Sequence, residues 1–174
     1  MSTRSIVVSL LSLAAMVLTS CTSLRLRHYT REMYKDNTNL LYLTRRTAEL
    51  GAPGVRWLLH DTRGSYDGDW EGFVGIGLRY ATCDVMPYLG PLLEDKDPRV
   101  RGFAARVAGH LLDDRFIPQL TALTCDTRAM PDLWFDRTVA DCARSALRAF
   151  ERKQEHSDDW QEEQRHIETE ASVP

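Results

Sequence analysis

The chain has 174 residues, of which 43% are hydrophobic and 27% are charged, and its formal net charge is −3. This length supports one domain with a substantial core and is short for two. Such a weak negative charge argues against a nucleic-acid partner, because nucleic-acid binding usually needs a concentrated basic face.

The first 21 residues have the pattern of an export signal that ends in a cysteine. Arg4 precedes an apolar run, Ile6 to Leu18, which has the length of a secretory signal and is too short to span a bilayer. An ordinary signal peptide followed by a chance cysteine is one interpretation of this pattern.

The last four residues of this segment, Leu18-Thr19-Ser20-Cys21, resemble the lipobox of bacterial lipoproteins. The resemblance implies that Cys21 carries a diacylglyceryl thioether, that residues 1–20 are removed, and that the new amino terminus is acylated. Cleavage would leave 154 residues with a net charge of −4.

The next residues predict a lipidated tether over 21–32. Thr22 stands where an aspartate would retain such a lipoprotein in the inner membrane, so the resemblance implies the outer membrane, with the protein facing the periplasm. Basic side chains follow with no acid before Glu32, namely Arg25, Arg27, His28 and Arg31. They would lie within a Debye length of anionic head groups and could press the base of the domain onto the membrane. A solvated tether that happens to be basic explains them equally well.

A single domain is expected over 33–152, and its first element is a predicted helix over 33–50. One face of this helix would carry Leu40, Leu41, Leu43, Thr47 and Leu50, and Gly51 would end it. We expect this helix to cap the repeats that follow, because terminal repeats need a cap.

Two segments repeat in the second half of the chain. Val85–Asp95 and Phe116–Asp126, 31 residues apart, share an apolar-Pro-x-Leu-x-x-Leu pattern that ends in an acid. Val100–Ala108 and Val139–Leu147 match at an offset of 39, so an insertion centred on 130–134 divides the last copy. A fainter earlier copy includes Gly72–Leu78. These matches predict three helical hairpins.

Local signals support helices within these copies. Asp97 can cap the helix that follows it, and Pro98 suits the first helical position. Apolar residues then recur at helical spacing, namely Val100, Phe103, Ala104, Val107, Ala108 and Leu111. Pro87 and Pro118 would lie in first turns, where proline is tolerated.

The run Leu92–Arg101, continued by Ala104 and Ala105, contains an acid-x-acid-Pro-x-Val-Arg sequence that resembles HEAT-like repeats of bilin lyases and many bacterial scaffold proteins. The repeats and the resemblance predict an all-α fold, a short α-α solenoid of about three HEAT-like helical hairpins with an N-terminal capping helix. The resemblance also implies that Arg101 ties adjacent units together through acids in the turns. The first copy lacks both the proline and the arginine, so the resemblance weakens toward the amino end.

The segment 153–174 is expected to be an acidic, disordered tail. Residues 151–174 hold eight acidic side chains against Arg152, Lys153 and Arg165, and few apolar residues besides Trp160 and Ile167. We therefore expect a helix that continues out of the domain and frays into disorder.

Three cysteines remain once Cys21 is lipidated, which is an odd number for an exported protein. Antiparallel packing in the last hairpin brings Cys125 near Cys142, so a disulfide can join them and leave Cys83 as a thiol. Three small buried thiols are the alternative.

Catalytic motifs are scarce in this sequence. It has no glycine-rich phosphate loop, nucleophile elbow or zinc-spaced cysteine set. His60-Asp61, and His110 with Asp113 and Asp114, fall at repeat turns or helix ends, where solvated polar residues are expected. We therefore predict no cofactor, no metal and no enzyme activity.

A protein-binding surface is the favoured functional site. Two long loops inside the hairpins, 62–69 and 127–138, carry residue types that are enriched in protein interfaces, and insertions of this kind often mark the binding side of a solenoid. The predicted contact residues are Tyr66, Trp70, Arg99, Met130, Trp134 and Phe135, with Arg63, Arg128 and Arg137 close by. Trp134 and Phe135 would instead fill the core if they begin the next helix.

These features together predict an envelope lipoprotein that holds or recruits an unidentified envelope protein through its helical repeats. A lyase- or chaperone-like enzyme that uses the repeat groove is one alternative, suggested by the bilin lyase resemblance. A purely structural envelope protein is the other.

Overall fold

The computed structural model describes residues 22–30, 40–60, 70–130 and 138–171, with side chains up to residue 155. Helices fill most of these ranges, and the described residues contain no β-strand beyond an isolated bridge between Ala129 and Thr138. The predicted all-α class is confirmed.

The described helices form three hairpins, with one helix directly ahead of them and a further helical segment before it. The leading helix is α2 (Leu40–Ala48), and the hairpins are α3 (Ala52–His60) with α4 (Trp70–Leu78), α5 (Met86–Leu93) with α6 (Pro98–Leu111), and α7 (Ile117–Leu123) with α8 (Val139–Ala171). A short 3₁₀ helix, η3 (Asp114–Phe116), leads into α7. Residues 22–30 are also helical.

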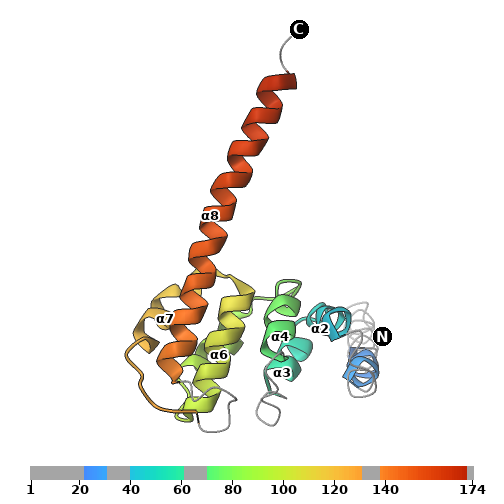
Figure 1. Ribbon diagram of the computed structural model, residues 1–174. Coiled ribbons are helices and arrows are strands. Elements are labelled where there is room, and N and C mark those ends of the chain that lie inside the picture. Colours follow the sequence, from blue (N-terminus) through green and yellow to red (C-terminus); the bar gives the residue numbers. More distant parts are fainter. Residues whose placement is uncertain (1–21, 31–39, 61–69, 131–137, 172–174) are drawn as a thin grey trace, which may run out of the picture.

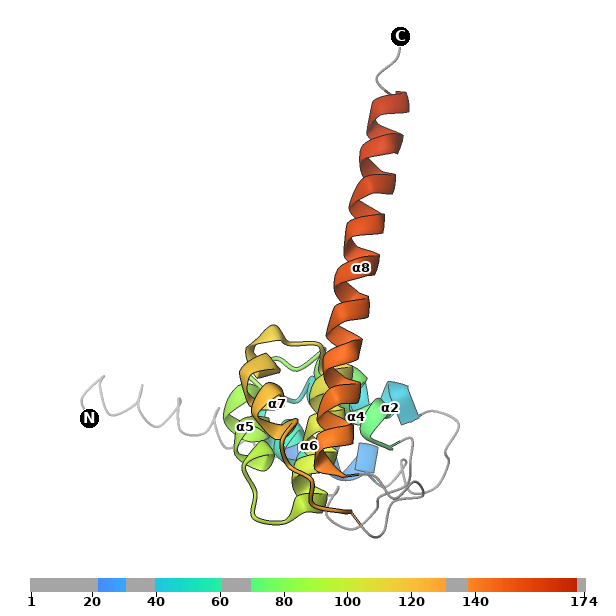
Figure 2. The ribbon, with the colours of Figure 1, turned by 60° about the vertical axis from the view of Figure 1, so that its left-hand side comes forward.

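The helices lie in two layers (Figure 1). Helices α2, α4, α6 and α8 pack in sequence in one layer, and in the second layer α3 contacts α5 and α5 contacts α7. The two helices of each hairpin also touch, and Figure 2 shows α5 and α7 together on one side of α6. This stacking is the predicted α-α solenoid of three hairpins.

Helix α6 lies at the centre of the solenoid, between α4 and α8. Asp97 caps it by accepting a hydrogen bond from the backbone N–H of Arg99, and Pro98 takes the first turn. All six residues of the predicted apolar face are buried, from Val100 to Leu111. The sequence-based prediction for this helix is confirmed, because its cap and its apolar period agree.

The leading helix differs from its prediction in the face that it buries. Its described part begins at Leu40, and Gly51 follows it with a positive φ of 74°, as expected for a stop. The buried face consists of Leu43, Thr44, Thr47 and Ala48, whereas Leu41 is 44% exposed. The predicted place of Leu41 on the buried face is wrong, because α3 and α4 pack around the two threonines and leave Leu41 at the margin.

Helix α8 is much longer than its repeat. It continues to Ala171, and its second half projects beyond the hairpins in both views (Figures 1 and 2). Residues 153–171 of the expected tail are described as a continuation of this helix, and residues 172–174 lie outside the described part of the chain. No proline or glycine stands between 139 and 171, and the long polar residues there favour helix.

The residues expected to form a tether also contain structure. Residues 22–30 are helical, and Tyr29 packs against the hydrophobic core. In the part of the chain that the structure describes, no helix is both long and apolar enough to cross a membrane.

Glycines allow the helices of one layer to approach closely. A β-carbon added at Gly75 in α4 would lie 2.5 Å from the β-carbon of His110 and 2.7 Å from the carbonyl oxygen of Val107, both on α6. At Gly109 in α6, the added carbon would lie 2.8 Å from the α-carbon of Ala146 on α8. Hydrogen is the only side chain that fits these contacts.

We predict that Gly75→Ala lowers the free energy of unfolding by about 1–3 kcal/mol, because the added methyl group has backbone atoms in its way. Gly72→Ala is the matched control on the same helix, since its methyl group would lie at an ordinary 3.6 Å from the His110 ring. It should raise the free energy by roughly 0.5–1 kcal/mol through helix propensity alone. Equal effects of the two variants in urea unfolding would contradict the close packing of α4 on α6.

Candidate functional site

Several of the predicted site residues lie outside the described part of the chain. They are Cys21, Tyr66, Trp134 and Phe135, together with the neighbouring Arg63 and Arg137. Trp70 is described; it is the first residue of α4 and packs partly buried against the core.

The other two predicted contact residues do not form one exposed surface. Met130 has no exposed area, and its sulfur occupies the space beside Gly102 of α6, so its predicted role on a contact surface is wrong. The absence of a side chain at Gly102 makes room for it. Arg99 is partly exposed at the start of α6, where its guanidinium donates to the carboxylate of Asp97.

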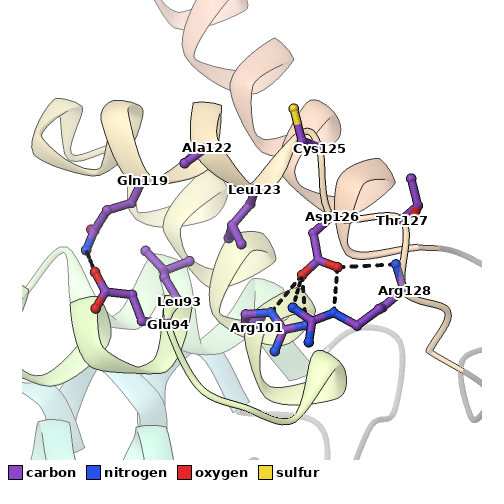
Figure 3. Close-up of a pocket in the computed structure, with 10 residues that line it drawn as sticks. All are labelled: Leu93, Glu94, Arg101, Gln119, Ala122, Leu123, Cys125, Asp126, Thr127 and Arg128. Atoms are coloured by element: carbon purple, nitrogen blue, oxygen red, sulfur yellow. Dashed lines mark hydrogen bonds and ion pairs between the residues drawn. The ribbon is translucent and has the colours of Figure 1, made fainter.

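No disulfide joins Cys125 to Cys142 in the structure. Cys142 is fully buried with its sulfur against α6, where a β-carbon at Gly102 would lie 3.7 Å from it. Cys125 is exposed, and Figure 3 shows its sulfur pointing away from Asp126. The predicted bridge fails because the two thiols face different environments. Cys83 is half-buried.

Arg101 connects the second hairpin to the third. Its Nε donates a hydrogen bond of 2.8 Å to Oδ2 of Asp126, which follows α7, and its Nη2 lies 2.7 Å from the same oxygen. Its Nη1 donates to the backbone carbonyl of Asp95, at the end of α5. Only 4% of the Arg101 side chain and 11% of the Asp126 side chain are exposed. This contact is the tie between units that was expected of Arg101.

The described residues contain three copies of a local Asp-x-Arg turn that sequence reasoning missed. In each copy the aspartate accepts the backbone N–H of the arginine two positions later, and the guanidinium of that arginine donates to the same carboxylate. The copies are Asp97 with Arg99, Asp113 with Arg115, and Asp126 with Arg128. These bonds close the turns around helices α6 and α7.

The same bonds keep these carboxylates ionised. The arginine of each turn lowers the pKa of its aspartate, and for Asp126 the hydrogen bonds from Arg128 and Arg101 lower the pKa to about 2. Asp126 therefore carries its charge at neutral pH between a buried and an exposed arginine. The side chain of Arg128 is 62% exposed.

An open pocket of about 580 Å³ lies beside the Arg101–Asp126 pair, between the second and third hairpins (Figure 3). Its apolar part comes from Leu93, Ala122 and Leu123. On one side Gln119 donates a hydrogen bond of 3.2 Å to Glu94, and on the other side lies the Asp126 turn. Cys125, Thr127 and Arg128 complete the lining. The pocket thus combines an apolar centre with polar groups of both signs at its edge.

The pocket suits contact with another molecule better than chemistry. Its charged side chains are held by hydrogen bonds within the protein: two arginines donate to Asp126, and Gln119 donates to Glu94. Among the residues that the structure describes, no group of three or more His, Cys, Asp or Glu side chains could hold a metal ion. Of the polar residues at repeat turns, Asp113 bonds to Arg115 and Asp114 pairs with Lys153.

Comparison with known proteins finds no match: no protein-family model, no curated protein and no solved structure is significantly similar to this chain.

One sequence signal could have located the pocket. The aligned segments Val85–Asp95 and Phe116–Asp126 both end in an acid, and Arg101 in the structure contacts the last residue of each. Because both repeat segments end in contact with Arg101, their ends must lie next to each other. The sequence predicted a binding surface in the two long loops instead, because aromatic residues like theirs are typical of protein interfaces.

Proposed function

We propose that this chain is a membrane-anchored envelope lipoprotein whose helical repeats hold or recruit a protein partner. The observation that carries the binding role is the open pocket between the second and third hairpins. The lipobox resemblance of Leu18-Thr19-Ser20-Cys21 carries the anchor.

The lining of the pocket fits a protein segment. Protein interfaces combine an apolar centre with a polar rim, and arginine is among the residue types enriched in them. Leu93, Ala122 and Leu123 supply the apolar centre, and the exposed Arg128 and Glu94 supply charges of opposite sign at the rim. A partner could insert one apolar side chain and place its polar groups against this rim, where Arg128 and Glu94 stay exposed beside the groups that hold them.

The architecture favours the same role. A solenoid presents an extended surface that is built from the edges of successive units, and solenoid proteins use such surfaces for binding. The buried tie between Arg101 and Asp126 holds the two units beside the pocket in a fixed relation. A rigid pocket loses little conformational entropy when it binds.

The proposed anchor defines where binding takes place. Acylation at Cys21 would hold the mature chain on a membrane, since two or more acyl chains give stable anchoring. Thr22, in place of a retention aspartate, favours the outer membrane with the solenoid in the periplasm. The partner would then be another envelope protein.

We predict that Ala122→Arg abolishes capture of the partner without unfolding the protein. Ala122 is exposed, and an arginine there would fill the apolar part of the pocket. The measurement is mild crosslinking in cells, followed by pull-down from detergent-solubilised membranes, with the melting temperature recorded for each variant.

Thr121→Arg is the matched control, because it adds the same charge at the neighbouring exposed position of α7, outside the pocket lining. It should retain the crosslinked partner that the wild-type chain returns. Loss of the partner in both variants, or in neither, would contradict binding at the pocket.

We predict that Cys21→Ser leaves the precursor uncleaved and without acyl label. The thioether forms on the cysteine sulfur, and the serine oxygen does not replace it. Metabolic labelling with a radioactive fatty acid and intact-mass measurement check this outcome. A wild-type chain that is cleaved and released without acyl groups would rule out the lipoprotein assignment.

A further inference from the structure

The amino-terminal end of the solenoid exposes most of the large apolar side chains that lie at the described surface. Four of the five that are strongly exposed belong to residues 22–30, α2 or the turn after α4, and they are Leu24 at 66%, Tyr42 at 57%, and Leu41 and Tyr80 at 44% each. The fifth is Ile117 on α7. Terminal units of a solenoid normally need a polar outer face, whereas the outer face at this end mixes polar with large apolar side chains.

Contacts link the three elements that carry these residues. The guanidinium of Arg45 lies 4.2 Å from the ring centre of Tyr80, which joins α2 to the end of α4. Tyr29 packs against the hydrophobic core, and its side chain raises the pKa of Arg46 on α2, which places residues 22–30 beside α2. Figure 1 shows residues 22–30 beside α2, at the end of the solenoid opposite α7. Leu41 and Tyr42 flank Arg45 on the outward side of α2.

The surface is also basic. Residues 22–30 and 40–48 contain four arginines, Arg25, Arg27, Arg45 and Arg46, and no aspartate or glutamate. Glu49, which follows α2, pairs with Arg45 and Arg46. Arg25 and Arg27 are exposed. Exposed leucine and tyrosine interleaved with arginine is the combination that binds the interface of an anionic bilayer.

We propose that this amino-terminal surface, made of Leu24, Leu41, Tyr42, Arg45 and Tyr80 with the neighbouring arginines, docks on the anionic phospholipid surface of the membrane. The inference rests on the proposed anchor, because Cys21 directly precedes residue 22 and its acyl chains would enter the bilayer beside this end. Docking would hold the amino-terminal end of the solenoid on the membrane and the pocket between the second and third hairpins away from the lipid.

The test uses the full lipidated protein reconstituted in vesicles of phosphatidylcholine, with and without phosphatidylglycerol. Intact mass first establishes that the sample carries acyl groups. Hydroxyl-radical footprinting then measures the oxidation rates of Tyr42 and Tyr80. Tyr88 is the internal reference, because it lies on α5, which carries no residue of the docking surface, and it too lies near an arginine: the guanidinium of Arg56 is 5.4 Å from its ring centre.

We expect Tyr42 and Tyr80 to be oxidised more slowly in vesicles that contain phosphatidylglycerol, and Tyr88 to be unchanged. Raised ionic strength should reverse the protection, because the arginine contribution is screened. Arg27→Gln should reduce the ratio of docked to undocked protein roughly fivefold, the effect of one arginine near an anionic surface, and Arg56→Gln should not change it.

Equal oxidation rates in the two kinds of vesicle would overturn the docking. Protection that grows with the protein-to-lipid ratio at constant lipid composition would overturn it as well, since a second copy would then cover the surface. A sample that carries no acyl groups would contradict the proposed anchor and leave the docking to be tested separately. That test adds the protein without acyl groups to the two kinds of vesicle, and unprotected Tyr42 and Tyr80 in both would overturn the docking.

Discussion

The buried ion pair between Arg101 and Asp126 is the contact on which the arrangement of the last two hairpins depends. It joins the middle helix of the solenoid to the end of α7, and both side chains are almost completely removed from water. A buried pair stabilises a fold only when its remaining hydrogen bonds are also satisfied. The carbonyl of Asp95 and the guanidinium of Arg128 meet that requirement. Loss of Asp126 would leave the buried guanidinium of Arg101 without a counter-charge, at a cost of about 3–5 kcal/mol, whereas loss of Arg101 would leave Asp126 with Arg128.

This constraint links the fold to the proposed function. The pocket lies between the two units that the pair joins, so its shape depends on their spacing. At the opposite end of the molecule, α2 exposes leucine and tyrosine beside arginine where a core-facing repeat would bury them. One end would therefore face lipid and the other a protein partner, and the close glycine contacts of α4 and α6 hold the helices of one layer together between the two ends.

The helices and their buried faces could be predicted where local signals and the repeats agree. They were harder to predict where tertiary contacts decide which face is buried. Asp97 and Pro98 predicted the start of α6, and its apolar period predicted its buried face. In contrast, the helical spacing of Leu41 predicted a core position, but α3 and α4 pack against the other side of its helix. The candidate site was predicted poorly, because attention to aromatic loops placed Met130 on the surface and passed over the repeated acids around Arg101. Which side chain fills the space at a glycine depends on helix packing, which a single sequence does not encode locally.

The most direct test of this account is a double-mutant cycle at the inter-unit pair. Urea unfolding at neutral pH would be measured for Arg101→Met, Asp126→Asn and the double variant, with Arg99→Met and Asp97→Asn as the exposed reference pair. We predict a coupling free energy of about 1–3 kcal/mol between Arg101 and Asp126, and roughly 0.2–1 kcal/mol for the reference pair. Additive effects of Arg101→Met and Asp126→Asn, to within about 0.5 kcal/mol, would contradict the central place of this pair.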